Sequence, residues 1–101
     1  MASTKEYRDY ILEQLSEVPD ITCRPMMGEF LLYSAGVLFG GIYDDRLLVK
    51  IVSENEQYKM PTSIPYDGAR PMYLVKNVDS KEKLAEIVEA TVKGLPYSDA
   101  V

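Results

Sequence analysis

The chain has 101 residues, a formal net charge of −5 and a hydrophobic fraction of 47%. This length predicts a single domain, residues 1–101, with no room for a second. The sequence has no histidine and one cysteine, Cys23. Histidine-based catalysis, imidazole-containing zinc sites and an internal disulfide are therefore excluded.

The amino-terminal residues 1–10 are polar and charged, which is not the pattern of a secretory signal peptide. No apolar run approaches the ~18 residues that a membrane-spanning helix needs. A lone cysteine is typical of a reducing compartment. We therefore expect a cytoplasmic protein without a membrane segment. No segment is basic, so we do not expect direct DNA binding, whose affinity comes mostly from cations that neutralise phosphates.

A helix is predicted near the amino terminus, from about residue 4 to residue 17. Ser3 and Glu6 have the spacing of a capping box, with Ser3 as the N-cap residue. Pro19 disfavours helical geometry in the residue before it and marks the end of the helix. The apolar residues of one helical face are Tyr7, Ile11, Leu15 and Val18.

Residues 21–52 have a β-prone pattern that predicts an antiparallel meander. Pro25 is typical of an edge strand or a bulge. The segments 34–36 and 44–45 are predicted turns, since glycine and aspartate tolerate left-handed backbone geometry. The expected strands are residues 21–24, 30–33, 37–43 and 46–52.

A second capping-box pattern, Ser53 with Glu56, predicts a short helix at residues 54–58. Residues 61–71 contain three prolines and form an irregular segment, and loops of this length are often functional. A last strand is expected at residues 72–76.

The final helix is predicted to begin at the capping sequence 79–82 and to end at Gly94, with Pro96 after it. We expect residues 97–101 to fray. The apolar face of this helix consists of Leu84, Ile87, Val88, Val92 and Leu95. Strands enclosed by helices predict an α+β fold: an antiparallel sheet of four to five strands with the first and last helices packed on one face.

The pair Gly40-Gly41 has two interpretations, a phosphate-binding loop or a β-hairpin. A phosphate loop places its glycines between a strand and a helix N-terminus. Here the strand pattern continues on both sides of the pair. We therefore interpret these glycines as a bulge or a point of close backbone approach.

Lys50 shares one face of its predicted strand with Leu48 and Val52. The simplest interpretation is an exposed lysine on the open face of the sheet, and a binding role is the alternative. Three further cations occur in the strand-and-loop region: Arg24, Arg70 and Lys76. With Lys50 they form either a small anion-binding cluster or scattered solubilising charge, and the sequence leaves both open.

Met27, Gly28 and Tyr66 are candidates for a contact surface, because methionine adapts its shape and tyrosine is enriched at interfaces. Tyr73 is left open between core and surface. We expect Met26, Tyr7 and Tyr33 to lie in the core.

Over about residues 5–95 the sequence resembles the N-terminal domain of the TfoX (Sxy) family. It departs from the family at Met27, where an aromatic residue is usual, and at Glu29, where glycine is common. The resembling motifs are Arg24-x-Met26-Met27-Gly28-Glu29-Phe30, Leu32-Tyr33, Gly36-Val37-x-Phe39, Asp44-Asp45-Arg46-Leu47-x-x-Lys50, Pro65-Tyr66 and Met72-Tyr73.

The resemblance implies an α+β domain of a bacterial regulator of competence for DNA uptake. The best-known members act in transcription with the cyclic-AMP receptor protein. The resemblance brings no catalytic residues and no cofactor. We therefore expect a non-enzymatic regulatory module that works through protein–protein contacts with the transcription machinery or a regulator, and a homodimer is left open.

The alternative hypothesis is a small-anion- or nucleotide-binding domain. In it, Lys50, Arg70 and Arg24 are ligands beneath the loop at residues 61–71. This hypothesis requires these cations to meet in one concave site.

Overall fold

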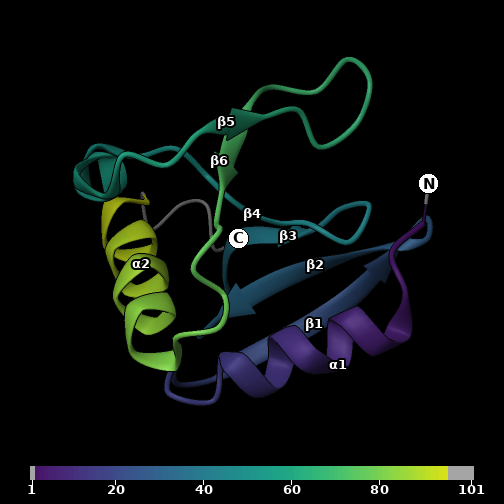
Figure 1. Ribbon diagram of the computed structural model, residues 1–101, viewed down its shortest axis with the longest axis horizontal. Coiled ribbons are helices and arrows are strands. Elements are labelled where there is room, and N and C mark those ends of the chain that lie inside the picture. The colour runs from purple at the N-terminus through teal and green to yellow at the C-terminus, as the bar shows by residue number, and fades with distance from the viewer. Residues whose placement is uncertain (1, 96–101) are drawn as a thin grey trace.

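The computed structural model describes residues 2–95, which form an α+β fold with one open antiparallel sheet and two α-helices (Figure 1). A short 3-10 helix, η1, lies between the fourth and fifth strands. The elements in chain order are α1 (Lys5–Gln14), β1 (Ile21–Met26), β2 (Glu29–Ser34), β3 (Val37–Ile42), β4 (Leu47–Val49), η1 (Ser53–Tyr58), β5 (Thr62–Ser63), β6 (Met72–Leu74) and α2 (Lys81–Gly94).

The sheet has six strands in the order β1-β2-β3-β4-β6-β5, and all its pairings are antiparallel. The predicted fold class is confirmed. The sequence predicted four to five strands and missed β5, which has only two residues and lies inside the segment that was expected to be irregular. Pro25 lies in the edge strand β1, where its missing amide hydrogen costs no sheet hydrogen bond.

Both α-helices contribute to a core on the same face of the sheet. In Figure 1, α1 runs along β1 and β2, whereas α2 lies beside η1. Burying one large aliphatic side chain stabilises a fold by about 1.5–3 kcal/mol, so this face contributes most of the stability. Its fully buried members include Ile11, Leu15, Leu32, Phe39, Leu47, Val49, Leu84, Ile87 and Val88.

Gly40 and Gly41 lie inside β3 at points where neighbouring backbone comes very close. A Cβ atom at Gly40 would lie 2.2 Å from the carbonyl oxygen of Leu48. A Cβ atom at Gly41 would lie 2.6 Å from the carbonyl oxygen of Phe30. The hairpin interpretation is thus confirmed, because these glycines make room for adjacent strands within the sheet.

The turn between β3 and β4 also matches the prediction. Asp44 and Asp45 both have left-handed backbone geometry, with φ angles of 53° and 55°. Tyr43 and Arg46 exchange backbone hydrogen bonds of 2.9 and 3.0 Å across this turn. Two left-handed residues in a two-residue loop match the twist of the flanking strands.

The first helix is shorter than predicted and is capped by a different residue. Its N-cap is Thr4, whose hydroxyl accepts a hydrogen bond from the amide of Tyr7 at 3.1 Å. The prediction of Ser3 as the cap is wrong, because the Ser3 hydroxyl instead donates to the Glu29 carboxylate at 2.6 Å. This contact fastens the amino terminus to β2. The helix ends at Gln14, and turns follow it through residues 15–17.

The prediction of Ser53 as a helix cap is also wrong. The N-cap of η1 is Val52, and its amide donates to the side-chain oxygen of Asn55 at 3.2 Å. Because Val52 begins this turn, β4 ends at Val49 rather than at the predicted residue 52. β6 likewise ends at Leu74, two residues before its predicted end.

The end of α2 is set by close packing. A Cβ atom at Gly94 would lie 2.8 Å from the Cβ of Val52 and 2.3 Å from a carboxylate oxygen of Glu54. Gly94 is the last helical residue, as predicted. Pro96 and the predicted frayed tail, residues 97–101, lie outside the described residues.

Two side chains, Met26 and Tyr33, differ in burial from the predictions. Met26 and Tyr33 are half-buried and lie outside the main core, so their assignment to the core is wrong. Tyr7 packs against the core as predicted, and Tyr73, left open by the sequence, does so too. Tyr33 differs because it lies on the face of the sheet that no α-helix covers, opposite Leu38.

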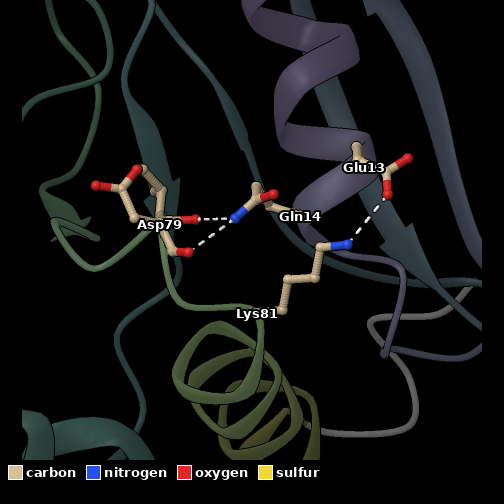
Figure 2. Close-up of polar contacts among 5 residues, drawn as sticks. Glu13, Gln14, Asp79 and Lys81 are labelled. Carbon is tan, nitrogen blue, oxygen red and sulfur yellow. Dashed lines mark hydrogen bonds and ion pairs between the residues drawn. The ribbon is translucent and has the colours of Figure 1, made fainter.

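Polar contacts join α1 to the segment that leads into α2 (Figure 2). The side-chain amide of Gln14 donates to the carbonyl oxygens of Val78 at 2.8 Å and Asp79 at 3.1 Å. Lys81 and Glu13 form an ion pair at 3.1 Å whose side chains are 40% and 70% exposed. Exposed pairs contribute only about 0–1 kcal/mol, so the Gln14 contacts are the stronger connection.

None of the helices between residues 2 and 95 has the length and apolar character that a membrane crossing requires.

Candidate functional site

A pocket of about 820 Å³ borders the face of the sheet that the α-helices leave uncovered. Strand β3 and the segment 50–52 that follows β4 form one side, the loop at residues 65–71 forms another, and Leu95 lies directly after α2. Its volume is in the range of sites that bind small organic molecules. The apolar part of its wall includes Leu38, Tyr43, Ile51, Pro65, Tyr66 and Met72.

Lys50 and Arg70 bring positive charge to this wall from two separate segments. Lys50 directly follows β4 and is half-buried, whereas Arg70 is an exposed residue of the loop. No acidic side chain is among the described lining residues. The described wall is therefore mostly apolar and carries two cationic residues.

The main chain at Lys50 is held on both sides. Its amide donates to the carbonyl oxygen of Phe39 at 2.9 Å, which continues the contact between β3 and β4. Its carbonyl oxygen accepts a hydrogen bond from the side-chain amide of Asn55 at 2.9 Å. Asn55 is fully buried, and its amide also donates to the hydroxyl of Thr91 in α2 at 2.8 Å. The position of Lys50 is thus linked to both the sheet and α2.

Arg46 fixes the beginning of the loop that covers the pocket. Its guanidinium donates to the Tyr43 carbonyl at 3.1 Å and to the Ser63 hydroxyl. It also reaches the carbonyl oxygens of Ile64 at 3.3 Å and Pro65 at 3.4 Å. One side chain therefore holds the turn after β3 and the start of the loop together.

Two tyrosines connect the loop to the sheet. The rings of Tyr43 and Tyr66 have centroids 6.1 Å apart and are tilted by 49°, and the centroid distance is within the range of favourable aromatic contacts. Tyr43 is 6% exposed, and Tyr66 is 57% exposed. Burial raises the pKa of the Tyr43 hydroxyl, and the nearby Tyr66 and Glu29 raise it further. Tyr43 is therefore a neutral phenol at physiological pH and adds no negative charge to the pocket wall.

Three of the six binding candidates from the sequence lie at this pocket: Lys50, Tyr66 and Arg70. The strand phase predicted for Lys50 is correct, because Leu47 and Val49 lie in the core on the helix side. The simplest interpretation placed Lys50 exposed on the open face of the sheet; the open face is confirmed, but the residue is half-buried in the pocket wall rather than exposed.

The other candidates lie elsewhere. Arg24 is exposed in β1, three strands away from β4, a separation of about 14 Å at the usual strand spacing. Arg24 and Lys76 are not among the residues of the pocket wall, so of the four cations whose clustering the sequence left open only Lys50 and Arg70 lie at one site. Met27 and Gly28 form the turn between β1 and β2, and Met27 is 96% exposed there.

A second, smaller pocket of about 360 Å³ lies on the other side of the Pro65-Tyr66 segment. Its wall includes three carboxylates, from Glu29, Asp44 and Asp67, together with Arg46. The Glu29 carboxylate already accepts hydrogen bonds from Ser3 and from the Asp44 amide. This acidic pocket contrasts with the cationic one. Within residues 2–95 there is no group of three or more potential ligands placed to hold a metal ion.

Sequence reasoning missed Tyr43 and Arg46. Tyr43 has the phase of Gly41, and its ring lies so close to that glycine that an added Cβ would be 2.8 Å away. The spacing of Gly41 and Tyr43, two positions apart in a strand, was the sequence feature that could have identified Tyr43. Arg46 carried no such signal, because its partners at β5 and in the loop lie 17–19 residues further along the chain.

A search with protein-family models finds no match to the sequence, and no curated protein matches it. The resemblance to the TfoX N-terminal domain stays a prediction. The pocket itself is therefore the feature from which a function can be proposed.

Proposed function

We propose that this protein is a non-enzymatic binding module that takes a small anionic molecule into the pocket between the sheet and the loop at residues 64–71. The observation that carries the proposal is that Arg70, an exposed arginine, lines a pocket whose described walls are mostly apolar. A site of this kind provides apolar contact area and a few charged groups that fix orientation. The sequence has no histidine, which removes the commonest general base and supports a binding role.

The test is a titration of the isotope-labelled protein with small anions, followed by amide chemical shifts. The panel contains phosphate, AMP and phenylbutyrate. At least one anion should shift the amides of the pocket wall in a saturable manner. Arg70→Gln should weaken that binding by about tenfold, the usual loss for a hydrogen bond to a charged group.

The matched control is Lys5→Gln, which also removes one exposed positive charge but lies at the start of α1. It should leave the affinity unchanged. Equal losses for the two variants would mean that only the overall charge matters, and the proposal would then fail.

A second candidate function is regulation through protein contact, the activity that the TfoX resemblance implies. It is favoured by Met27, a large apolar side chain that is 96% exposed at the tip of the β1–β2 turn. In this proposal, the turn at residues 27–28 contacts a transcription regulator. Sedimentation of the purified protein with purified cyclic-AMP receptor protein tests it: a complex that Met27→Glu abolishes supports the contact, and the absence of a complex contradicts it.

A further inference from the structure

Among the large apolar side chains between residues 2 and 95, Met27 is the most exposed, at 96%. We propose that Met27 is a reversible oxidation site: a peroxide converts its thioether to a sulfoxide, and a methionine sulfoxide reductase restores the thioether. The selectivity of this reaction depends neither on the pocket nor on a protein partner, so the proposal goes beyond both proposed functions.

The first argument is the contrast between Met27 and the other methionines of residues 2–95. Met26, Met60 and Met72 are half-buried. Met60 packs against the core, and Met72 lies in the pocket wall. Because a peroxide must reach the sulfur atom, the rate of oxidation follows the exposure of the side chain. The fold therefore leaves Met27 open to a peroxide and shields the other three.

The second argument is that the backbone holds Met27 outward. Met26 and Glu29 pair across the hairpin, and Met27 and Gly28 form the two-residue turn between them, with φ angles of 52° and 86°. Both angles are left-handed, as this kind of hairpin turn requires. The backbone amide of Ser3 donates to the Gly28 carbonyl oxygen at 3.0 Å, which fastens the turn to the segment before α1 (Figure 1). The exposure of Met27 is therefore a property of a turn that is held by the sheet and by the amino-terminal segment.

The third argument concerns the competing sulfur atom of Cys23. The thiolate is the form of cysteine that peroxides oxidise readily. Cys23 is half-buried, and burial raises the pKa of its thiol above the ordinary value of 9.0. At neutral pH this thiol is therefore mostly protonated and reacts slowly. The thioether of Met27 needs no ionisation, so a peroxide reacts there first.

The reaction transfers one oxygen atom. The Sδ atom of Met27 attacks one oxygen of hydrogen peroxide, the O–O bond breaks as the S–O bond forms, and the second oxygen leaves as water. The sulfur loses two electrons, which the peroxide gains. In the reverse direction, a reductase uses a dithiol that supplies two electrons and two protons: the sulfoxide oxygen leaves as water, and the dithiol becomes a disulfide.

Oxidation changes the surface of the turn without disturbing the core. A sulfoxide is polar, whereas a thioether is apolar. Since the Met27 side chain is 96% exposed, neither form is buried on folding, and the stability of the protein stays unchanged. A protein contact through the turn at residues 27–28 loses its apolar anchor on oxidation. This consequence alone rests on the proposed contact with a transcription regulator.

The experiment treats the full chain with hydrogen peroxide and follows each methionine by peptide mass spectrometry, with fragmentation that separates Met26 from Met27. Met27 should oxidise at least about tenfold faster than Met26, Met60 and Met72, because only its sulfur is open to the reagent. In concentrated urea the fold shields no side chain, so the four rates should agree within about threefold. The peptide that contains Met1, which lies outside the described residues, is scored separately.

A matched pair of variants tests the location. Met27→Leu removes the exposed thioether and should abolish fast oxidation among residues 2–95. Met60→Leu makes the same chemical change at a half-buried position and should leave the fast reaction intact. In the oxidised wild type, amide shifts should change only near residues 26–29, and the thermal midpoint should not move. The two reductase types, one for each sulfoxide epimer, should together remove the added oxygen in the presence of dithiothreitol.

Equal rates at Met27 and at the half-buried methionines of the folded protein would overturn the proposal, and so would earlier oxidation of Cys23. A Met27 sulfoxide that both reductases leave in place would also overturn it.

Sedimentation of the oxidised protein with purified cyclic-AMP receptor protein separates this proposal from the protein contact. A complex that forms only with the unoxidised protein supports both. If no complex forms while Met27 oxidises selectively and reversibly, the contact is contradicted and the oxidation site stands.

Discussion

Arg46 donates a guanidinium hydrogen bond to the hydroxyl of Ser63, and this contact joins the start of β4 to β5, two strands that do not pair with each other. The same guanidinium reaches the carbonyl oxygens of Ile64 and Pro65. One side chain that does not line the pocket itself thus holds the start of the loop over it. This arrangement separates the stability of the loop from the chemistry of the wall.

The first prediction tests this separation with Arg46→Gln. The variant should lose about 1–3 kcal/mol of unfolding free energy, because several hydrogen bonds to a charged donor disappear. Amide hydrogen exchange at residues 64–71 should become faster, while exchange in β2 and β3 stays slow. Arg24→Gln, an exposed arginine in β1, is the control and should change neither quantity. Unchanged exchange in the loop of Arg46→Gln would show that other contacts hold it.

Local patterns account for the parts of this fold that could be predicted from the sequence. The face occupied by Lys50 follows from the alternation of side chains along a strand, and the Asp44-Asp45 turn follows from the geometry that aspartate tolerates. The features that could not be predicted depend on contacts between residues that are far apart in the chain. Ser3 and Thr4 are both suitable caps, and the choice between them depends on Glu29, a residue 26 positions from Ser3.

The pocket likewise combines a feature that local sequence patterns predict with one that depends on long-range folding. The loop at residues 61–71 could be recognised from its prolines and its length. That Arg70 and Lys50 share one wall depends on the folding of this loop over β3 and β4, and no local pattern encodes it. Arg24 has the same charge and lies in the same part of the sequence as Lys50, yet the strand order β1-β2-β3-β4 keeps it away.

The second prediction tests the Gly40-Gly41 pair with the variant Gly40→Ala. The added methyl group would lie 2.2 Å from the Leu48 carbonyl oxygen, so β3 and β4 could not keep their register. We expect a loss of at least about 3 kcal/mol, the upper range for overpacking, measured by urea unfolding. The comparison is Gly36→Ala, where φ is +83° and no atom lies within 4 Å of the added group. That variant should lose only about 1 kcal/mol from backbone strain. A Gly40→Ala protein as stable as Gly36→Ala would contradict the close-approach interpretation.

The third prediction concerns the buried contact between Asn55 and Thr91. Both side chains are fully buried, and Asn55 holds the Val52 amide, the Lys50 carbonyl and the Thr91 hydroxyl. Asn55→Ala should lose about 3 kcal/mol or more, since it leaves buried backbone groups without partners and creates a cavity.

The control for this prediction is Thr91→Val, which keeps the volume of the side chain and should lose only about 1 kcal/mol. The double variant tests the coupling, because two contacting residues should show an interaction energy of at least about 0.5 kcal/mol. Simple additivity of the two losses would mean that the hydrogen bond between Asn55 and Thr91 contributes nothing to stability.

The fourth prediction is a pH dependence that arises from Tyr43. Burial raises the pKa of its hydroxyl above the ordinary value of 10.0, so the folded state retains this proton at a pH where the unfolded state releases it. The corresponding stability is fully present below pH 10.0 and is lost as the pH rises through the folded-state pKa. The unfolding free energy of the protein should therefore fall at alkaline pH, and Tyr43→Phe should remove the part of that fall caused by this residue.

The measurement is urea unfolding of both proteins at about pH 8 and about pH 11, where other titrating groups act on the two proteins alike. The advantage of the wild type over Tyr43→Phe should be smaller at the higher pH, and an advantage that stays constant or grows would mean that the Tyr43 hydroxyl is not desolvated by the fold.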